Sequence, residues 1–206
     1  MGGLEDMFES DHYLTFRHER TPAVTTNVHA VAAWPENPHT PAILNWISTE
    51  MIRSQGLPRC KWHLSPYYTL GEIGRLFAVI DQPVATRIAL DAGEILLEHQ
   101  LPSGGWGIQD PTSEETAYAV LALDKLRQVG LLDHVRVSAA LERGINFLSA
   151  HEPDHSPLWV GKSLYYVPPL ERWLRHLCTQ VMEKGAKAIT VLYVDDNPNY
   201  RLILDS

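Results

Sequence analysis

Proline and glycine residues divide this chain into segments of helical length, and this punctuation limits the folds open to it. Proline lacks the amide donor that continues a helix, and glycine commonly follows a helix end. Between these residues apolar side chains recur at helical spacing, and strands are not expected there. The predicted helices span residues 22–34, 40–55, 66–80, 83–99, 112–129 and 135–150.

Short connections join the predicted helices in pairs, so the sequence predicts an all-α fold of stacked helical hairpins. Such hairpins form either a solenoid or a closed α/α barrel, and we favour part of a barrel. Pro22 follows Thr21, a good capping residue, and marks the expected start of the first helix.

Apolar spacing also predicts which side chains are buried. The expected buried faces carry Val24, Val28, Val31 and Ala32 in the first helix, and Ile43, Leu44, Ile47, Met51 and Ile52 in the second. Trp34, Trp46 and Trp173 sit at helical spacing with aliphatic residues, and we expect them in the core.

Composition excludes several classes of partner. The 206 residues are 45% hydrophobic and carry a formal net charge of -8 with no run of basic residues, so nucleic acid is not expected to bind. The start is acidic and no long apolar stretch follows, so neither an export signal nor a membrane span is expected. Two widely separated cysteines suit a reducing compartment, which predicts a cytoplasmic location.

Three parts are predicted along the chain: a lead-in over residues 1–20, a helical domain over 21–180 and a β-prone tail over 181–206. The tail, with Asp195 and Asp196 after a strand-like run, resembles the first strand and acidic corner of response-regulator receiver domains. The phosphate-accepting aspartate of that family has no counterpart here, so phosphotransfer is not expected. We interpret the tail as a junction or a truncation.

A staple-like motif lies between the fourth and fifth predicted helices. Gln100, Gly104 and Trp106 form the pattern Q-x3-G-x-W, in which glycine permits a tight turn, the glutamine amide can satisfy helix-end groups and the tryptophan can pack against the next helix. This pattern resembles the QW repeat of squalene-hopene and related cyclases. The following residues 115–123, ETAYAVLAL, resemble the continuation of that repeat.

Three further stretches, residues 15–33, 61–69 and 157–165, resemble bacterial and fungal class II diterpene cyclases in the same order. The resemblance covers about residues 8–178 and implies a terpenoid cyclase or prenyltransferase-like barrel. It also implies cyclisation begun by protonation, in which the middle aspartate of a D-x-D-D motif is the general acid. No D-x-D-D occurs in this sequence, and Asp195-Asp196-Asn197-Pro198-Asn199 also lacks the last carboxylate of a D-D-x-x-D magnesium motif. We therefore expect the chain alone to be inactive.

The resemblance also implies roles for particular residues. His29 matches the histidine that hydrogen-bonds the catalytic aspartate in squalene-hopene cyclases. Aromatic faces stabilise carbocations without offering a basic atom, and core packing is the alternative role for each ring. The residues expected to line such a pocket are Trp62, Tyr67, Tyr68, Trp159 and Tyr165.

Substrate and cofactor follow from the same resemblance. The expected substrate is a linear prenyl diphosphate or a polyprene. Among the cations of the matched stretches, which are Arg17, Arg20, Lys61 and Lys162, we favour Lys162 for the diphosphate because it is flanked by apolar and aromatic residues. In this family magnesium is bound by an acidic motif in a preceding helical domain, so its site is not expected in this chain. A complementary N-terminal cyclase segment is the expected protein partner.

Two other functions stay open. A protein-prenyltransferase subunit has a related barrel and holds zinc, and Cys60 and His63 in a C-x-x-H spacing invite that comparison, although no third ligand cluster is evident. A non-catalytic cyclase remnant or assembly partner is favoured by the missing acid motif.

Overall fold

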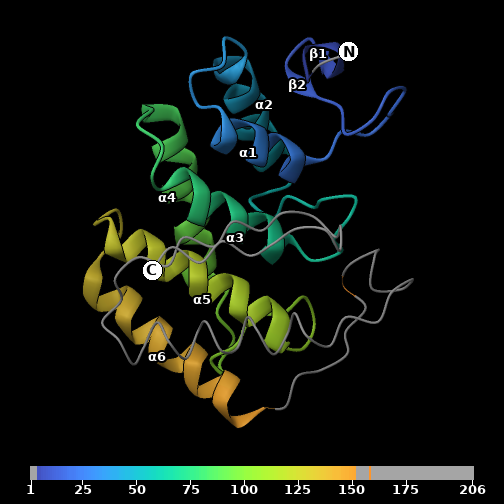
Figure 1. Ribbon diagram of the computed structural model, residues 1–206. Coiled ribbons are helices and arrows are strands. Elements are labelled where there is room, and N and C mark those ends of the chain that lie inside the picture. The colour runs from blue at the N-terminus through green and yellow to red at the C-terminus, as the bar shows by residue number, and fades with distance from the viewer. Residues whose placement is uncertain (1–3, 152–157, 159–206) are drawn as a thin grey trace, which may run out of the picture.

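The structure is a computed structural model that describes residues 4–151 and Leu158, and six α-helices dominate this part (Figure 1). The helices are α1 (Val24–Ala33), α2 (Thr40–Arg53), α3 (Pro66–Phe77), α4 (Pro83–Glu98), α5 (Ser113–Gln128) and α6 (His134–Ala150). The all-α prediction is confirmed, and every predicted helix is present. None of the described helices is both long and apolar enough to cross a lipid bilayer. Trp173 and the tail over 181–206 lie outside the described residues.

The predicted start of the first helix was wrong. α1 begins at Val24 after an extended Ala23, and no side chain caps it. The reason lies in Asn27, whose amide Nδ2 donates to the carbonyls of Ala23 and Tyr13 at 3.1 and 3.0 Å. These bonds hold the preceding residues as an extended segment against α1, so Thr21 and Pro22 do not enter the helix.

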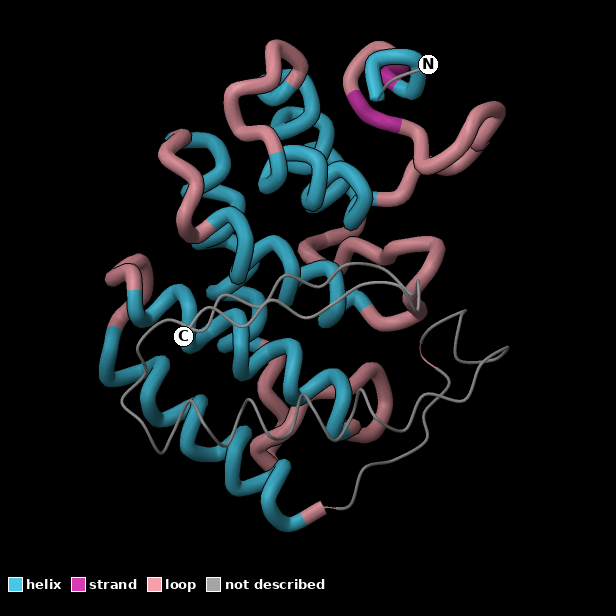
Figure 2. The backbone as a smooth tube through the Cα atoms, in the orientation of Figure 1, coloured by secondary structure: helices cyan, strands magenta, loops and turns pink. Residues whose placement is uncertain are grey.

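The lead-in contains a short structure that the sequence did not predict. A 3-10 helix over Leu4–Met7 precedes two antiparallel strands, β1 (Phe8–Glu9) and β2 (His12–Tyr13), shown in Figure 2. These strands were not predicted, because two-residue strands are too short to show an alternating pattern. Tyr13 is buried at 1% exposure, and its amide donates to Asn27 Oδ1 at 2.6 Å. The lead-in is thus packed against α1.

The helices form three hairpins, α1–α2, α3–α4 and α5–α6, stacked in one row. α1 contacts α3 and α3 contacts α5, which makes an inner layer, while α2 packs on α4 behind it. The connections within hairpins are short, at residues 34–39, 78–82 and 129–133, whereas 54–65 and 99–112 join successive hairpins. Because each hairpin repeats the direction of the one before, the N-terminal ends of α1, α3 and α5 lie at the same end of the layer (Figure 1).

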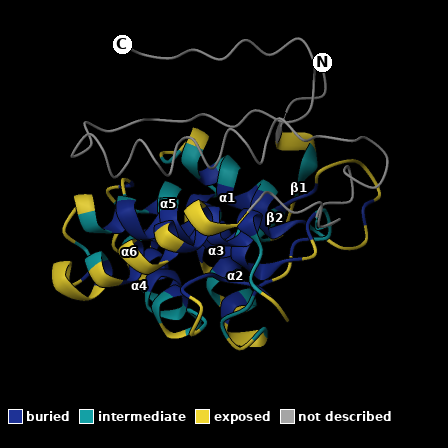
Figure 3. Ribbon diagram, turned by 90° about the horizontal axis from the view of Figure 1, so that it is seen from below, coloured by how far each residue is buried: buried dark blue, intermediate teal, exposed yellow. Residues whose placement is uncertain are grey.

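Burial follows the predicted faces with clear exceptions. The buried positions lie where helices face one another, and exposed positions lie on the outer turns (Figure 3). Trp34 is 48% exposed and Ile52 is 78% exposed, so their assignment to the core was wrong. Trp34 follows the last residue of α1, and Ile52 lies in the last turn of α2 outside the face that carries the buried Ile47 and Met51. Trp46 and Ala32 are partly buried against the core.

Gln100 and Trp106 bind α6 and α4, but not in the way expected. The indole of Trp106 donates to the carbonyl of Leu96 at 2.7 Å, so tryptophan, not glutamine, satisfies a helix-end group of α4. Gln100 Nε2 donates to the carbonyls of Gly104 and Ala140, each at 2.8 Å, which ties the turn to the middle of α6. Gly104 has a φ of +93°, which favours glycine.

Replacing Trp106 by Phe should lower the free energy of unfolding by about 1–3 kcal/mol, because the buried carbonyl of Leu96 loses its donor. Urea denaturation followed by circular dichroism measures this change. The matched control is Trp34→Phe at an exposed position, which should change stability by no more than about 0.5 kcal/mol. Equal effects of the two substitutions would contradict the role of the Trp106 indole.

Candidate functional site

Two buried carboxylates lie in the first turn of α5, at the shared N-terminal end of the inner layer. Glu114 and Glu115 are each 1% exposed. Thr112 caps the helix by accepting from the amide of Glu115 at 3.1 Å, and its own amide donates to the carbonyl of Trp106. In a capping box, the glutamate would return to the amide of the cap residue. Because that amide is already bound, Glu115 is free to accept from Ser65 Oγ at 2.6 Å across the interface with α3.

His63 lies beside these carboxylates and is 1% exposed. The amide of Ser65 donates to Nδ1 at 3.2 Å, so that nitrogen carries no proton. The proton of the ring is therefore on Nε2, which lies 3.1 Å from Glu114 Oε1. The geometry fixes His63 as a neutral imidazole whose two ring nitrogens both have protein partners.

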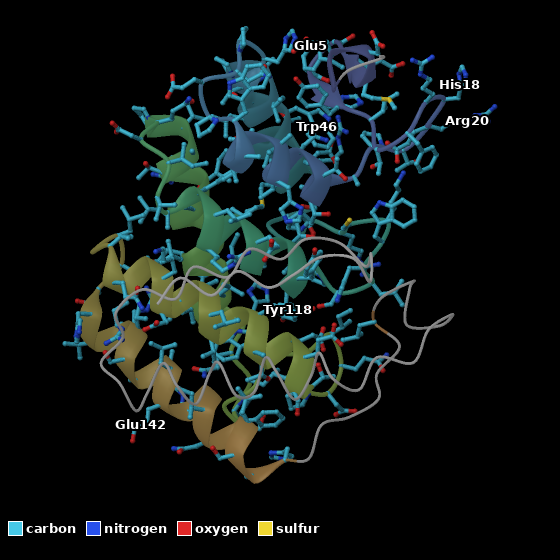
Figure 4. The ribbon with its side chains drawn as sticks, viewed as in Figure 1. Glu5, His18, Arg20, Trp46, Tyr118 and Glu142 are labelled. Atoms are coloured by element: carbon cyan, nitrogen blue, oxygen red, sulfur yellow. The ribbon has the colours of Figure 1, made fainter. Side chains whose placement is uncertain are left out.

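The aromatic rings nearest to this polar cluster come from α3 and α5. Tyr68 stacks on His63 with ring centroids 4.6 Å apart, and Tyr118 meets the edge of both rings. Tyr118 also donates its hydroxyl to Glu114 Oε1 at 3.0 Å. Figure 4 shows Tyr118 on α5, well apart from Arg20 on the lead-in. Tyr68, His63 and Tyr118 are here called the aromatic cluster. His63 and Tyr118 of this cluster contact the Glu114 carboxylate.

His29 on α1 binds a third buried carboxylate, Glu72. Its Nε2 lies 2.7 Å from Oε2 of Glu72 on α3, and the Glu72 side chain is only 8% exposed. Arg75, one turn later on α3, donates from Nη2 to both oxygens of Glu72, at 3.0 and 3.1 Å. Tyr68 and Glu72 are four residues apart, so they share one face of α3. That face of α3 therefore carries both Glu72, the partner of His29, and Tyr68, a member of the aromatic cluster.

The pKa values of Glu72 and Glu115 are shifted in opposite directions. Burial is the largest influence on Glu72 and raises its pKa, but the hydrogen bond from His29 and the charge of Arg75 together hold its pKa below the usual range. Burial also raises the pKa of Glu115, and hydrogen bonds from Ser65 and Thr112 offset only part of that increase. Glu72 therefore holds its negative charge more strongly than an ordinary glutamate, whereas Glu115 takes up a proton more readily than an ordinary glutamate.

The structure separates the aromatic residues proposed for the pocket wall. Tyr68 belongs to the aromatic cluster, whereas Tyr67 is buried in the apolar core, where burial and the charge of Glu115 raise its pKa. Trp62 meets Phe16 of the lead-in edge-on, with centroids 6.2 Å apart. Trp159, Tyr165 and Lys162 lie outside the described residues.

Lys61 fastens the lead-in to the segment before α3. Its ammonium pairs with the buried carboxylate of Glu19 and lies over the rings of Phe16 and Trp62, at 4.6 and 4.9 Å from their centroids. Burial lowers the pKa of Lys61. Its charge is thus matched within the chain, and the structure gives Lys61 a packing role.

The residues described in the structure include no group of three or more histidine, cysteine or acidic side chains placed to hold a metal ion. Cys60 Sγ lies 2.9 Å from Thr25 Oγ1, and both nitrogens of His63 are bound as described above. Both side chains of the C-x-x-H pair therefore have protein partners in this structure.

Sequence reasoning missed Glu72, Glu114, Glu115 and Tyr118 as site residues. The spacing of Glu114 and Tyr118, four residues apart on a predicted helix, was the available signal for their contact. Nothing in the local sequence distinguishes these buried carboxylates from the solvated acids of an amphipathic helix.

Comparison with known proteins finds similar sequences and a similar fold among terpenoid cyclases and diphosphate synthases. The chain is 34% identical over 175 residues to terpentedienyl-diphosphate synthase of Kitasatospora griseola, covering 79% of this chain and 35% of that protein. It is 31% identical over 174 residues to type B diterpene cyclase of Mycobacterium tuberculosis, covering 80% of this chain and 33% of that protein. The fold matches ent-copalyl diphosphate synthase from Streptomyces platensis with a TM-score of 0.72 and 28% identity, over 86% of this chain and 36% of that one.

These matches cover only part of each relative. The chain spans about a third of the length of the curated relatives it matches, at 35% and 33% of the two named above. No family model matches the chain.

Replacing Glu72 or Glu115 by Gln should change the pH dependence of stability in opposite directions, because their pKa values are shifted in opposite directions from 4.5. The stability that the wild type gains over Glu72→Gln should be complete above about pH 4.5 and shrink as pH falls through the lowered pKa. Relative to Glu115→Gln, the wild type should be most stable at acid pH and lose this advantage as pH rises through the raised pKa. Urea unfolding from pH 3 to 7 measures both, and parallel pH profiles would contradict the assignment.

Proposed function

Because the chain belongs to the class II diterpene cyclase-like family, we propose that it supplies the C-terminal part of an enzyme that cyclises a linear prenyl diphosphate. The proposed reaction begins with protonation of a carbon-carbon double bond. It is an isomerisation, because a proton added to one carbon is matched by a proton lost from another.

One observation carries this proposal: about four fifths of the chain aligns with diterpene cyclases, with a matching fold. The site supports it in two ways. His29 lies on an inner helix with one ring nitrogen held by a buried carboxylate, as suits a residue that supports an acid. The aromatic cluster supplies ring faces of the kind that stabilise a carbocation.

The general acid must come from a part of the enzyme that this sequence does not contain, since it has no D-x-D-D motif. Protonating an alkene requires a carboxylic acid that is kept neutral and made unusually acidic by hydrogen bonding. We assign that hydrogen-bonding role to His29. The chain alone therefore lacks the group that starts the reaction.

The substrate's diphosphate and its metal form a further part of the proposal. We assign Lys162 to the diphosphate and expect the complete enzyme to need magnesium. The residues described here do not fit a magnesium site, since no three acidic or histidine side chains converge. Any such site would then lie outside the described residues.

A second candidate is a non-catalytic cyclase remnant or assembly partner. The missing D-x-D-D motif favours it, because the packing residues at Gln100 and Trp106 maintain the fold without any acid. The two candidates differ in one outcome: only the enzyme part gains activity when an acid-bearing segment is supplied.

The purified chain should convert no geranylgeranyl diphosphate in the presence of magnesium, because it has no general acid. Adding an N-terminal cyclase segment that carries D-x-D-D, either in trans or as a fusion, should produce a cyclic diphosphate. Gas chromatography with mass spectrometry after dephosphorylation measures the product. No product from a folded, associated pair would favour the remnant.

In the complemented enzyme, replacing His29 by Ala should reduce turnover by about 100-fold or more, as expected when one positioned proton-transfer group is lost. The matched control is His39→Ala, since His39 also binds a carboxylate, but its partner Glu5 lies on the lead-in and is 59% exposed. Equal losses in the two variants would argue against a specific role for His29.

A further inference from the structure

We propose that Glu72 is the positioning residue of His29: it fixes the ring proton on Nε2 and reserves Nδ1 for the group that His29 serves. The assignment of the tautomer stands on the geometry alone. Its catalytic consequence rests on the proposed function.

The tautomer follows from the chemistry of the contact. An ionised carboxylate only accepts hydrogen bonds, so the proton between Glu72 Oε2 and His29 Nε2 must belong to the imidazole. Arg75 donates to both oxygens of Glu72 and favours its ionised state. A neutral His29 is therefore protonated at Nε2 and carries its lone pair on Nδ1.

His29 differs from the other histidines that pair with carboxylates in the described part of the chain. Asp11 and Glu5, the partners of His12 and His39, are more than half exposed, at 51% and 59%. His63 has a buried partner, but Ser65 occupies its other ring nitrogen. Only His29, among these, combines a buried carboxylate with an Nδ1 that has no hydrogen-bond partner among the described residues.

The arrangement is held from two helices. His29 is on α1 and its side chain is 38% exposed, whereas Glu72 and Arg75 are on α3 and largely buried. The carboxylate is thus bound by Arg75 from its own helix and by the imidazole from α1. A buried, immobile partner is what keeps a partly exposed ring in one orientation.

In the proposed enzyme this arrangement would assist the acid. When the ring is doubly protonated, Glu72 balances the imidazolium charge and Nδ1–H donates to the carboxyl group of the supplied acid. As the alkene's π electrons form a bond to the acid's proton, the O–H bond breaks and leaves a carboxylate that keeps this hydrogen bond. Stabilising the conjugate base in this way makes the acid stronger.

The test is nuclear magnetic resonance of the chain with 15N-labelled histidine, at alkaline pH where one ring proton remains. The wild type should show His29 with a protonated Nε2 and an unprotonated Nδ1. In Glu72→Gln the side-chain amide can donate as well as accept, so His29 should show both tautomers. A wild-type ring protonated at Nδ1, or an unchanged tautomer in the variant, overturns the proposal.

Asp124→Asn on α5 is the matched control. Asp124 is a buried helical carboxylate that accepts from Arg127, three residues later, at 2.6 Å, as Glu72 accepts from Arg75, but no histidine among the described residues binds it. This variant should lower stability by a comparable amount and leave the His29 resonances in place. A tautomer change in Asp124→Asn would show that the signal reports general loosening, and would also overturn the proposal.

Activity provides a separate measurement in the complemented enzyme. Glu72→Gln should lower kcat about tenfold or more with KM little changed, and the double variant with His29→Ala should be no slower than His29→Ala alone. Additive losses contradict positioning through His29. An inactive wild-type complex would refute the proposed function only, because the tautomer is measured without turnover.

Discussion

Buried carboxylates impose the strongest constraint on this structure. Glu72, Glu114, Glu115 and Asp124 all lie within the inner layer, where an ion without partners would be costly. Glu72 is bound by donors from α1 and α3, whereas Glu114 and Glu115 are bound by donors from their own end of α5 and from the segment before α3. Satisfying these groups fixes the relative positions of α1, α3 and α5, because a small shift of any one helix would break a charged hydrogen bond.

The same interactions connect stability with the candidate chemistry. The pair of Glu72 with His29 joins α1 to α3, and the contact of Glu114 with His63 joins α5 to the segment before α3. Apolar packing alone tolerates small displacements, whereas these contacts have narrow distance requirements. The residues that hold the inner layer together therefore include His29 and members of the aromatic cluster, to which the proposed function assigns roles.

The helices were predictable, and much of the site was not. Proline, glycine and capping residues are local signals, and they placed α2 to α6 within a few residues of their ends. The start of α1 was misplaced because Asn27 and Tyr13 determine it through contacts across the lead-in. His29 was identified through resemblance, whereas its partner Glu72 lies 43 positions away and is found only when the helices are packed. The spacing of acidic residues in the sequence does not distinguish the buried acids from those at the surface, so only the structure identifies the buried ones.

The two kinds of connection in this fold should differ in how they tolerate inserted residues. Segments 34–39, 78–82 and 129–133 turn the chain within a hairpin, away from the site, so extra residues there would disturb packing at the hairpin tips without changing the site. Segments 54–65 and 99–112 join hairpins and also carry His63, Ser65, Trp106 and Thr112. Changes of length in these joints would disturb packing and chemistry together. Divergence among proteins with this architecture is therefore expected to proceed by insertion at the hairpin tips and by substitution in the joints.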